Sequence, residues 1–262
     1  MDREPSVYFI GAGPGALDLL TVRAQRILGR ADLILYADSL VNPGIASLAK
    51  PGAEVAESSG LTLEEIAGRM IQVARGGRLV ARVHSGDPSL YGAIREQMAA
   101  LQAAGVGYEV VPGVSSMFAA AAVLGVELTL PEISQTVIVG RAEGRTPVPD
   151  QQKLRDLAAH RATMAIYLSA GMIGRVVAEL LRGGYPESTS AAVVYRATWP
   201  DQQTFRGTLS DIAEAVHAAG IDRQALILVG DALAPISDRD RSVASLLYDP
   251  AFGHGYRKAS RP

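Results

Sequence analysis

The chain contains no cysteine, which excludes disulfides, cysteine nucleophiles and thiolate metal clusters. It also lacks any apolar run of about 18 residues, the length that a membrane helix needs. The first residues, Met-Asp-Arg-Glu-Pro, do not have the charged and then apolar order of a signal peptide. These absences predict a soluble, cytoplasmic protein without a membrane partner.

Several common functional sites are missing as well. The net charge of −2 argues against a general nucleic-acid surface. There is no Gly-x-Ser-x-Gly nucleophile motif and no phosphate loop with a Walker lysine. The spacing of the four histidines argues against a zinc site, so no metal is expected; they are His84, His160, His217 and His254.

Arginine dominates the cations, because only Lys50, Lys153 and Lys258 among the 25 basic residues are lysines. A codon bias explains this composition, and so does recognition of anions, since a guanidinium grips carboxylates with two hydrogen bonds. The 262 residues are 48% hydrophobic, which is enough for one large or two medium domains with a sizeable core.

Short apolar runs and helical periods alternate along the first half of the chain. The predicted strands are residues 6–11, 32–37, 78–84 and 108–111. The predicted helices are residues 17–28, 62–75, 94–104 and 114–124. These strands are too apolar to be half exposed, so the pattern predicts a mainly parallel sheet that is covered on both faces.

The pattern changes after about residue 130. The predicted strands there are residues 136–140, 163–168, 191–195, 203–206 and 225–229. Two of these strands follow each other without a helix, which implies antiparallel pairing and therefore a mixed sheet. We expect an N-terminal α/β domain over 1–130, a C-terminal α/β domain over 131–240 and a polar tail over 241–262.

The stretch Gly11-Ala-Gly-Pro-Gly-Ala16 lies between a strand and a helix, and it resembles a dinucleotide fingerprint. Asp38 closes the second strand, near where a ribose-binding acid would lie. Pro14 counts against this interpretation, because it has no backbone N–H to face a pyrophosphate. A tight turn that uses the freedom of glycine is the other interpretation.

Two further glycine-bearing loops follow strands. In Ser85-Gly-Asp-Pro-Ser-Leu-Tyr-Gly92, Gly86 would let a ligand approach the backbone, whereas Asp87 or Ser89 could instead cap the next helix. In Val111-Pro-Gly-Val-Ser-Ser-Met117, Ser115 and Ser116 offer hydroxyls, or again a cap. Ligands gather at the carboxyl ends of parallel strands, so three such loops favour one shared site.

These segments, in this order, resemble the tetrapyrrole methylase family. The matching motifs are Gly-Ala-Gly-Pro-Gly with Leu-Leu-Thr after it, Gly-Asp-Pro-x-x-Tyr-Gly, Pro-Gly-Val-Ser-Ser, Tyr-Leu-Ser and Val-Val-Tyr-Arg-Ala-Thr-Trp. The segments at 35–41, 135–138, 141–149 and 197–201 narrow the resemblance to one branch, whose members methylate a ring carbon in cobalamin synthesis. The family often has an acid where this chain has Ala16.

The resemblance implies two α/β domains with the active site in the cleft between them, a homodimer and S-adenosyl-L-methionine as cofactor. The residues that it assigns to the cofactor are Pro14, Gly86, Asp87, Leu90, Tyr91, Ser115, Ser116, Leu168 and Ala197. The implied substrate is a reduced tetrapyrrole with many carboxylate arms.

Arg141, Arg145 and Arg196 lie in or beside loops, and we expect them to bind these carboxylate arms, although a solvated surface is the other interpretation. Asp38 is a weak candidate for a catalytic residue, and no obligatory general base is evident. Two other functions are left open, an NAD-dependent oxidoreductase built on residues 11–16 with Asp38, and a tetrapyrrole-binding module without catalysis.

Overall fold

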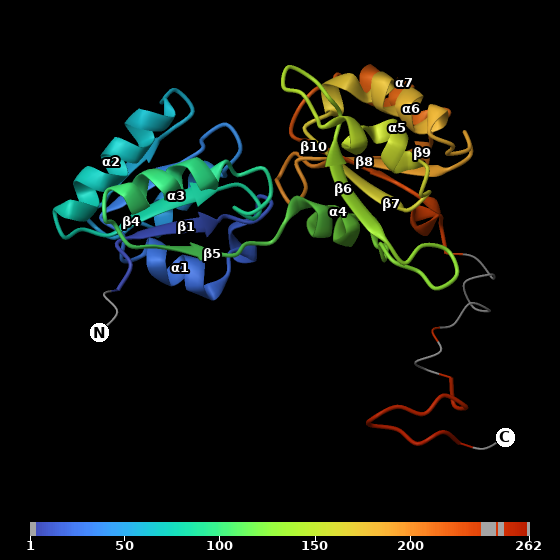
Figure 1. Cartoon of the computed structure of the whole chain (residues 1–262), viewed down its shortest axis with the longest axis horizontal. Helices are drawn as coiled ribbons and strands as arrows, with labels where there is room; N and C mark the ends of the chain where they lie inside the picture. Colours follow the sequence, from blue (N-terminus) through green and yellow to red (C-terminus); the bar gives the residue numbers. More distant parts are fainter. Residues whose placement is uncertain (1–3, 237–244, 246–248, 261–262) are drawn as a thin grey trace. The chain divides into compact units, whose positions relative to one another are not determined.

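The computed structural model describes residues 4–236, 245 and 249–260 (Figure 1). The described chain forms two compact units. The first runs to Val123 and also includes Arg196–Gln202, and the second contains Leu124–Tyr195 and the residues from Gln203 onwards. The predicted domain boundaries at residues 130 and 240 and the predicted active-site cleft between the domains stay predictions. Part of the predicted tail, 241–244, 246–248 and 261–262, lies outside the described residues.

The first unit contains a parallel sheet with the strand order β3-β2-β4-β1-β5. Its strands are β1 (Val7–Gly11), β2 (Leu33–Tyr36), β3 (Glu54–Glu57), β4 (Val80–His84) and β5 (Tyr108–Val111). Four of them were predicted. The edge strand β3 was not, because Glu54-Val-Ala-Glu57 has only two apolar residues between two glutamates and carries too little apolar signal.

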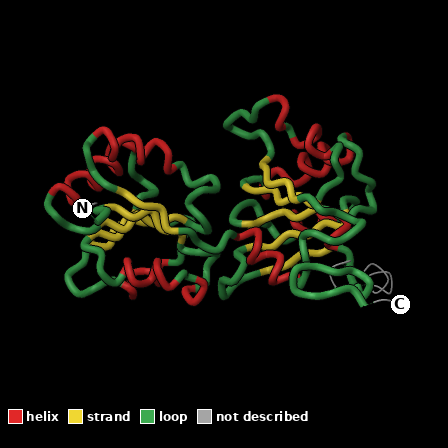
Figure 2. The backbone as a smooth tube through the Cα atoms, turned by 60° about the horizontal axis from the view of Figure 1, so that its bottom comes forward, coloured by secondary structure: helices red, strands yellow, loops and turns green. Residues whose placement is uncertain are grey.

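Helices cover both faces of this sheet (Figure 2). Successive residues of a strand point to opposite faces. In β1, Tyr8 and Ile10 pack with α1 (Val22–Leu28), whereas Val7 and Phe9 pack with α2 (Leu63–Arg75) and α3 (Ile94–Ala103). The apolar strands are therefore buried on both sides, as the sequence predicts.

The single helix predicted over residues 17–28 is wrong in its first part. Leu17–Leu19 form a 3-10 turn, and α1 begins only after Thr21, whose hydroxyl accepts the Ala24 N–H at 3.1 Å. A threonine in this capping position satisfies an amide that the helix leaves unpaired, so the helix starts there. The remaining 3-10 turns are Pro43–Leu48, Asp150–Gln152, Ala170–Met172 and Asp231–Leu233.

The second unit contains a mixed sheet with the order β6-β7-β10-β8-β9, in which only β6 and β7 are parallel. Its strands are β6 (Val137–Arg141), β7 (Thr163–Tyr167), β8 (Ser190–Tyr195), β9 (Gln203–Thr208) and β10 (Ala225–Val229). The antiparallel pairing of β8 with β9 confirms the mixed sheet expected from two successive strands.

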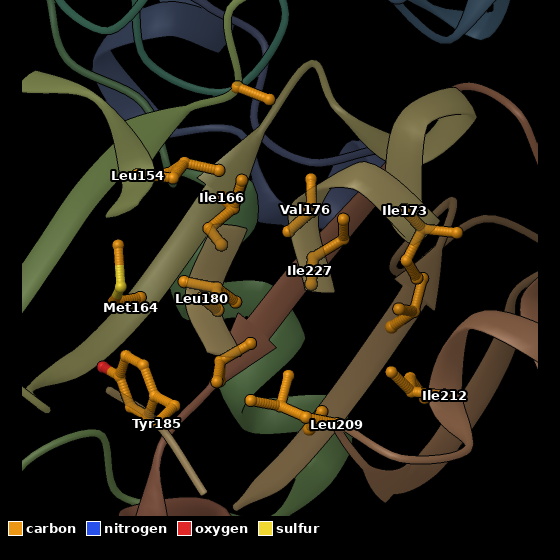
Figure 3. Packing of buried hydrophobic residues seen from close by; sticks show 14 of the residues in the cluster. Leu154, Met164, Ile166, Ile173, Val176, Leu180, Tyr185, Leu209, Ile212 and Ile227 are labelled. Atoms are coloured by element: carbon orange, nitrogen blue, oxygen red, sulfur yellow. The ribbon is translucent and has the colours of Figure 1, made fainter. Parts of the chain in front are cut away.

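Helices α5 (Leu154–Ala158), α6 (Ile173–Arg182) and α7 (Ile212–Ala218) pack on this sheet. Figure 3 shows the core that they form, with Val176 and Leu180 of α6 against Ile166 and Ile227 of the sheet. Helix α4 (Ser116–Leu124) precedes these elements in the chain. No helix among the described residues is long and apolar enough to span a bilayer.

Candidate functional site

The candidate site lies at the carboxyl ends of three neighbouring strands in the first unit. Strand β1 lies between β4 and β5, so the segments that follow these three strands leave the sheet side by side. They are the first loop (residues 12–16), the second loop (residues 85–92) and the third loop (residues 112–115). The structure thus brings together the three glycine-bearing segments that the sequence singled out.

Four glycines, Gly11, Gly13, Gly86 and Gly113, make a glycine junction in which the three segments touch through their backbones. A Cβ on Gly11 would lie 2.6 Å from the Gly86 carbonyl oxygen and 2.6 Å from the Gly113 Cα. A Cβ on Gly113 would lie 2.7 Å from the Gly11 Cα and closer still to the Gly86 oxygen. No residue with a side chain can take these two positions without moving a neighbouring backbone.

Backbone hydrogen bonds join the first and second loops at this junction. The Gly13 N–H donates to the Gly86 carbonyl at 3.2 Å, and the Gly86 N–H donates to the Gly13 carbonyl at 2.8 Å. Both glycines have positive φ, +74° for Gly13 and +63° for Gly86, a conformation that favours glycine. The junction therefore depends on glycine for its conformation as well as for its close packing.

Asp87 joins the second loop to the third. One carboxylate oxygen accepts the Ser89 N–H at 2.8 Å and the Ser89 hydroxyl at 2.5 Å, and the other accepts the Gly113 N–H at 2.9 Å. Burial works to raise the pKa of Asp87, but the hydrogen bonds from Ser89 and Gly113 outweigh it and the pKa is lowered. Asp87 is therefore a carboxylate that ties two loops together.

Asp87 and Ser89 do not cap the following helix, so that interpretation is wrong. Helix α3 begins after Ala93, which has a φ of +47° and makes no side-chain cap. The loop before it is tight, because a Cβ on Gly92 would lie 3.0 Å from the Pro88 carbonyl carbon and 3.2 Å from its Cα. Tyr91 also has a positive φ, of 55°, and its side chain is 44% exposed.

The third loop leads into α4. Gly86 faces the start of this helix, since a Cβ on it would lie 3.7 Å from the Ser116 nitrogen and 3.8 Å from the Ser115 Cα. The Ser115 carbonyl accepts the N–H groups of Phe118 and Ala119, so the helix is hydrogen-bonded from its first turn. The two predicted serines thus lie next to the glycine of the second loop.

The first loop is not arranged as a dinucleotide site. The Ala12 N–H donates to the His84 carbonyl, the Gly13 N–H to Gly86, and the Ala16 N–H to the Thr198 hydroxyl at 3.0 Å. Pro14 has no N–H, and the donors of Ala12, Gly13 and Ala16 are already used inside the protein, which leaves few amides to hold a pyrophosphate. The NAD-dependent alternative is therefore not favoured.

Asp38 lies in the same unit, after β2. Its carboxylate accepts the Ser59 N–H at 3.0 Å and the Ser59 hydroxyl at 2.7 Å. The hydroxyl bond from Ser59, followed by the amide bond, lowers the pKa of Asp38. A carboxylate held in this way keeps its charge and is a weak proton acceptor.

The turn Arg196–Gln202 between β8 and β9 belongs to the first unit, although the sequence placed it in the second domain. Its Ala197, a predicted cofactor residue, is buried, and its neighbour Thr198 holds the first loop. The predicted substrate residue Arg196 forms an ion pair with Asp201, and its guanidinium lies 4.0 Å from the centre of the Trp199 ring.

Two buried polar residues of β4 were not assigned a role from the sequence. Arg82, 5% exposed, donates to the Leu35 carbonyl at 3.2 Å, the Ser58 hydroxyl at 2.9 Å and the Gln97 side chain at 3.1 Å. Burial lowers its pKa to about 10. His84, 6% exposed, has no hydrogen-bond partner at Nε2.

Three predicted residues belong to the second unit. Leu168 follows β7, has a φ of 55° and is 64% exposed. The Arg141 guanidinium donates to the carbonyls of Ala142, Thr146 and Pro147 and so folds its own loop around itself. Arg145 is exposed in that loop. In the part of the chain that the structure covers, no His, Asp and Glu cluster is placed to hold a metal ion.

Comparison with known proteins gives a consistent result. The family model Tetrapyrrole (Corrin/Porphyrin) Methylases matches residues 6–213. The chain is 51% identical to the cobalt-precorrin-4 C(11)-methyltransferase of Priestia megaterium over 253 residues, which cover 96% of this chain and 97% of that protein.

Two solved structures are similar as well. The X-ray structure of a cobalt precorrin-4 methyltransferase, a cobalamin biosynthetic enzyme, matches with a TM-score of 0.86 and 51% identity over 87% of this chain and 96% of that one. The uroporphyrin-III C-methyl transferase of Thermus thermophilus, complexed with S-adenosyl homocysteine, matches with a TM-score of 0.72 and 30% identity over 87% of this chain and 98% of that one.

Proposed function

Because the chain belongs to the tetrapyrrole methylase family, we propose that it is a precorrin-4 C11-methyltransferase dependent on S-adenosyl-L-methionine. It would convert precorrin-4 into precorrin-5 in cobalamin biosynthesis. The observation that carries the proposal is the glycine junction at the ends of β1, β4 and β5, in a chain half identical to a methyltransferase of this kind. The cobalt in that relative's name makes cobalt-precorrin-4 the second candidate substrate.

The loops around the junction suit such a cofactor. Gly86 presents backbone without a side chain beside Ser115 and Ser116, and the donors and acceptors there are amides, carbonyls and hydroxyls, which suit adenine and ribose. The proposed cofactor residues in the first unit are Pro14, Gly86, Asp87, Leu90, Tyr91, Ser115, Ser116 and Ala197. Leu168, of the second unit, is included on the family resemblance alone.

The bound cofactor would supply a methyl group that is already electrophilic, because a sulfonium carries it. The chain's own residues therefore have to bind, orient and exclude water, a task that supplies several kcal/mol without proton transfer. Asp38 suits a binding role of this kind, because its carboxylate is held charged. It is better suited to accept a hydrogen bond from a pyrrole N–H than to remove a proton. Arg141, Arg145 and Arg196 are the proposed partners of the substrate's carboxylate arms.

The decisive experiment supplies labelled S-adenosylmethionine with precorrin-4 and, separately, with cobalt-precorrin-4. We expect a product one methyl heavier, with the label at C11 by NMR, and micromolar binding of S-adenosylhomocysteine by calorimetry. Binding of NADH without S-adenosylhomocysteine would support the oxidoreductase instead. Tetrapyrrole binding without label transfer would support the non-catalytic binding module. The substrate that is methylated faster identifies whether the natural substrate is metal-free or contains cobalt.

Asp87→Ala should weaken S-adenosylhomocysteine binding more than Arg141→Ala does. The first change removes the carboxylate that holds the Gly113 amide and Ser89, so two loops of the proposed cofactor site lose their link. The second releases only a loop of the other unit. Losing hydrogen bonds to a charged group costs about 1.5–3 kcal/mol, or roughly tenfold to a hundredfold in affinity. Equal calorimetric affinities for the two variants would remove Asp87 from the site.

A homodimer in the cytoplasm belongs to the same proposal and is supported by the family resemblance. Light scattering coupled to size-exclusion chromatography measures the mass in solution. A mass of about twice the 27.5 kDa of one chain supports the dimer, and a monomer mass at working concentrations contradicts it.

A further inference from the structure

The turn Arg196–Gln202 grips the first glycine-bearing loop, and we propose that Trp199 in this turn is a positioning residue for the methyl transfer. This inference rests on the proposed function, because it names a residue that would align the site for that reaction. Trp199 is the only tryptophan of the chain. It lies in the first unit together with the loop that it contacts, although 185 residues separate it from Pro14.

Three consecutive residues of the first loop are each held by a distant side chain. The Trp199 indole N–H donates to the Pro14 carbonyl at 2.9 Å, and the Ala16 N–H donates to the Thr198 hydroxyl at 3.0 Å. Between them, the Gly15 carbonyl accepts from the Asn42 side chain at 2.9 Å. The end of the loop that leads away from the glycine junction is thus fixed mainly by the turn.

The indole also packs directly on Gly15. A Cβ on this residue would lie 3.0 Å from the Trp199 Cγ and closer still to Cδ1 and Nε1. Gly15 has no positive φ, so its conformation does not require glycine. The glycine is required because the indole occupies the space where a side chain would be, which makes Gly15 and Trp199 a complementary pair.

Contacts within the turn fix its own conformation. Arg196 and Thr198 have φ values of 45° and 70°, an uncommon conformation for residues with side chains. The Thr198 N–H donates to the Gln202 side chain at 2.7 Å, and the Trp199 N–H donates to the Arg196 carbonyl at 3.0 Å. The Arg196 guanidinium lies over the indole and pairs with Asp201.

Trp199 therefore contacts residues that belong to both the proposed cofactor site and the proposed substrate site. Trp199 anchors the turn that contains Ala197, assigned to the cofactor, and it orders Arg196, assigned to a substrate carboxylate. It also fixes residues 14–16, which continue directly into the glycine junction. Since a displacement of about 1 Å can cost a hundredfold in rate, a residue that aligns these parts acts on the reaction without touching the reacting atoms.

The first test replaces Trp199 with phenylalanine, which keeps an aromatic ring under Arg196 and loses the bond to Pro14. At a temperature where the variant is folded by circular dichroism, we expect kcat to fall about tenfold. The KM for S-adenosylmethionine should change less than threefold. A kcat equal to that of the wild type would overturn the proposal. Gln203→Ala, exposed at the start of β9, is the matched control and should keep wild-type kinetics.

The second test is a double-mutant cycle with Gly15. Gly15→Ala alone should lower kcat at least tenfold, because its methyl group collides with the indole. In the Trp199→Ala background the same change should cost less than threefold, because the colliding group is gone. Equal losses in the two backgrounds, or no loss in the first, would show that the pair does not position the loop.

A third measurement needs no activity and so separates this inference from the proposed function. Hydrogen exchange of the ligand-free protein should be faster for residues 12–16 in Trp199→Ala than in the wild type, with residues 163–167 of β7 unchanged. Unchanged exchange of residues 12–16 contradicts the positioning role, whatever reaction the enzyme performs. If exchange rises but the wild type transfers no methyl group, the proposed function fails and the loop anchor remains.

Discussion

Replacing Gly113 with alanine is expected to destabilise the first unit by at least about 1–3 kcal/mol and to abolish measurable binding of S-adenosylhomocysteine. The added methyl group would lie 2.7 Å from the Gly11 Cα and closer to the Gly86 carbonyl oxygen. Both neighbours are backbone atoms of central strands or their loops, so neither can rotate away as a side chain would. The loops have to separate, and the Asp87 bond to the Gly113 amide is lost with them.

Urea unfolding measures the stability and calorimetry measures the binding. The matched control is Gly68→Ala on α2 in the same unit, where no atom lies within 4 Å of the added methyl group. Since alanine favours a helix interior over glycine by about 0.5–1 kcal/mol, this variant should be more stable than the wild type and bind normally. A Gly113→Ala protein as stable as the control and with unchanged affinity would refute the tight glycine junction.

The sequence predicts most of the first unit because its strands are buried on both faces. Runs such as residues 6–11 and 32–37 are almost wholly apolar, and such a run can be recognised in the sequence without knowing which elements pack against it. The edge strand β3 has glutamates at both ends and is only half buried, so its signal is weak. The early start assigned to α1 failed for a local reason, since the apolar period at residues 17–20 did not reveal the cap at Thr21.

The candidate site was predicted in part. Three glycine-bearing loops at strand ends were expected to meet, and parallel pairing of β1 with β4 and β5 brings them together. The role of the glycines differs from the expectation, however. Gly86 was expected to admit a ligand to the backbone, and its carbonyl also packs against Gly11 and Gly113 of the adjoining segments. A single sequence does not reveal whether a glycine makes room for a ligand or for a neighbouring segment of the backbone.

The turn Arg196–Gln202 could not be assigned to the first unit from the sequence. The hydrogen bond from Ala16 to Thr198 spans 182 residues, and no periodicity or spacing encodes a contact of that separation. Position in the chain pointed to the second domain, because β8 and β9 on either side belong to its sheet. Only the folded backbone shows that the turn joins the first unit, and with it the role of Trp199.

Lowering the pH from 6.5 to 5 should cost the protein about 2 kcal/mol of unfolding free energy through His84 alone. Burial first, and then the charge of Arg82, lower the pKa of His84 from its ordinary 6.5 to about 3. Between these two values the unfolded chain binds a proton at His84 that the folded chain does not. The free energy of unfolding is therefore unaffected above pH 6.5 and falls by about 1.4 kcal/mol per pH unit below it.

Urea unfolding at several pH values between 5 and 6.5 measures this slope. The window lies above the range in which carboxylates with lowered pKa values, such as Asp87 and Asp38, take up protons. His84→Gln should flatten the slope, because glutamine has no proton to gain, whereas His160→Gln at an exposed position should keep it. If His84→Gln is too unstable to fold, NMR titration of the wild-type ring replaces it. A His84 ring that titrates near 6.5 in the folded protein would show that the imidazole is open to water. The burial of His84 at the end of β4, beside the second loop, would then be wrong.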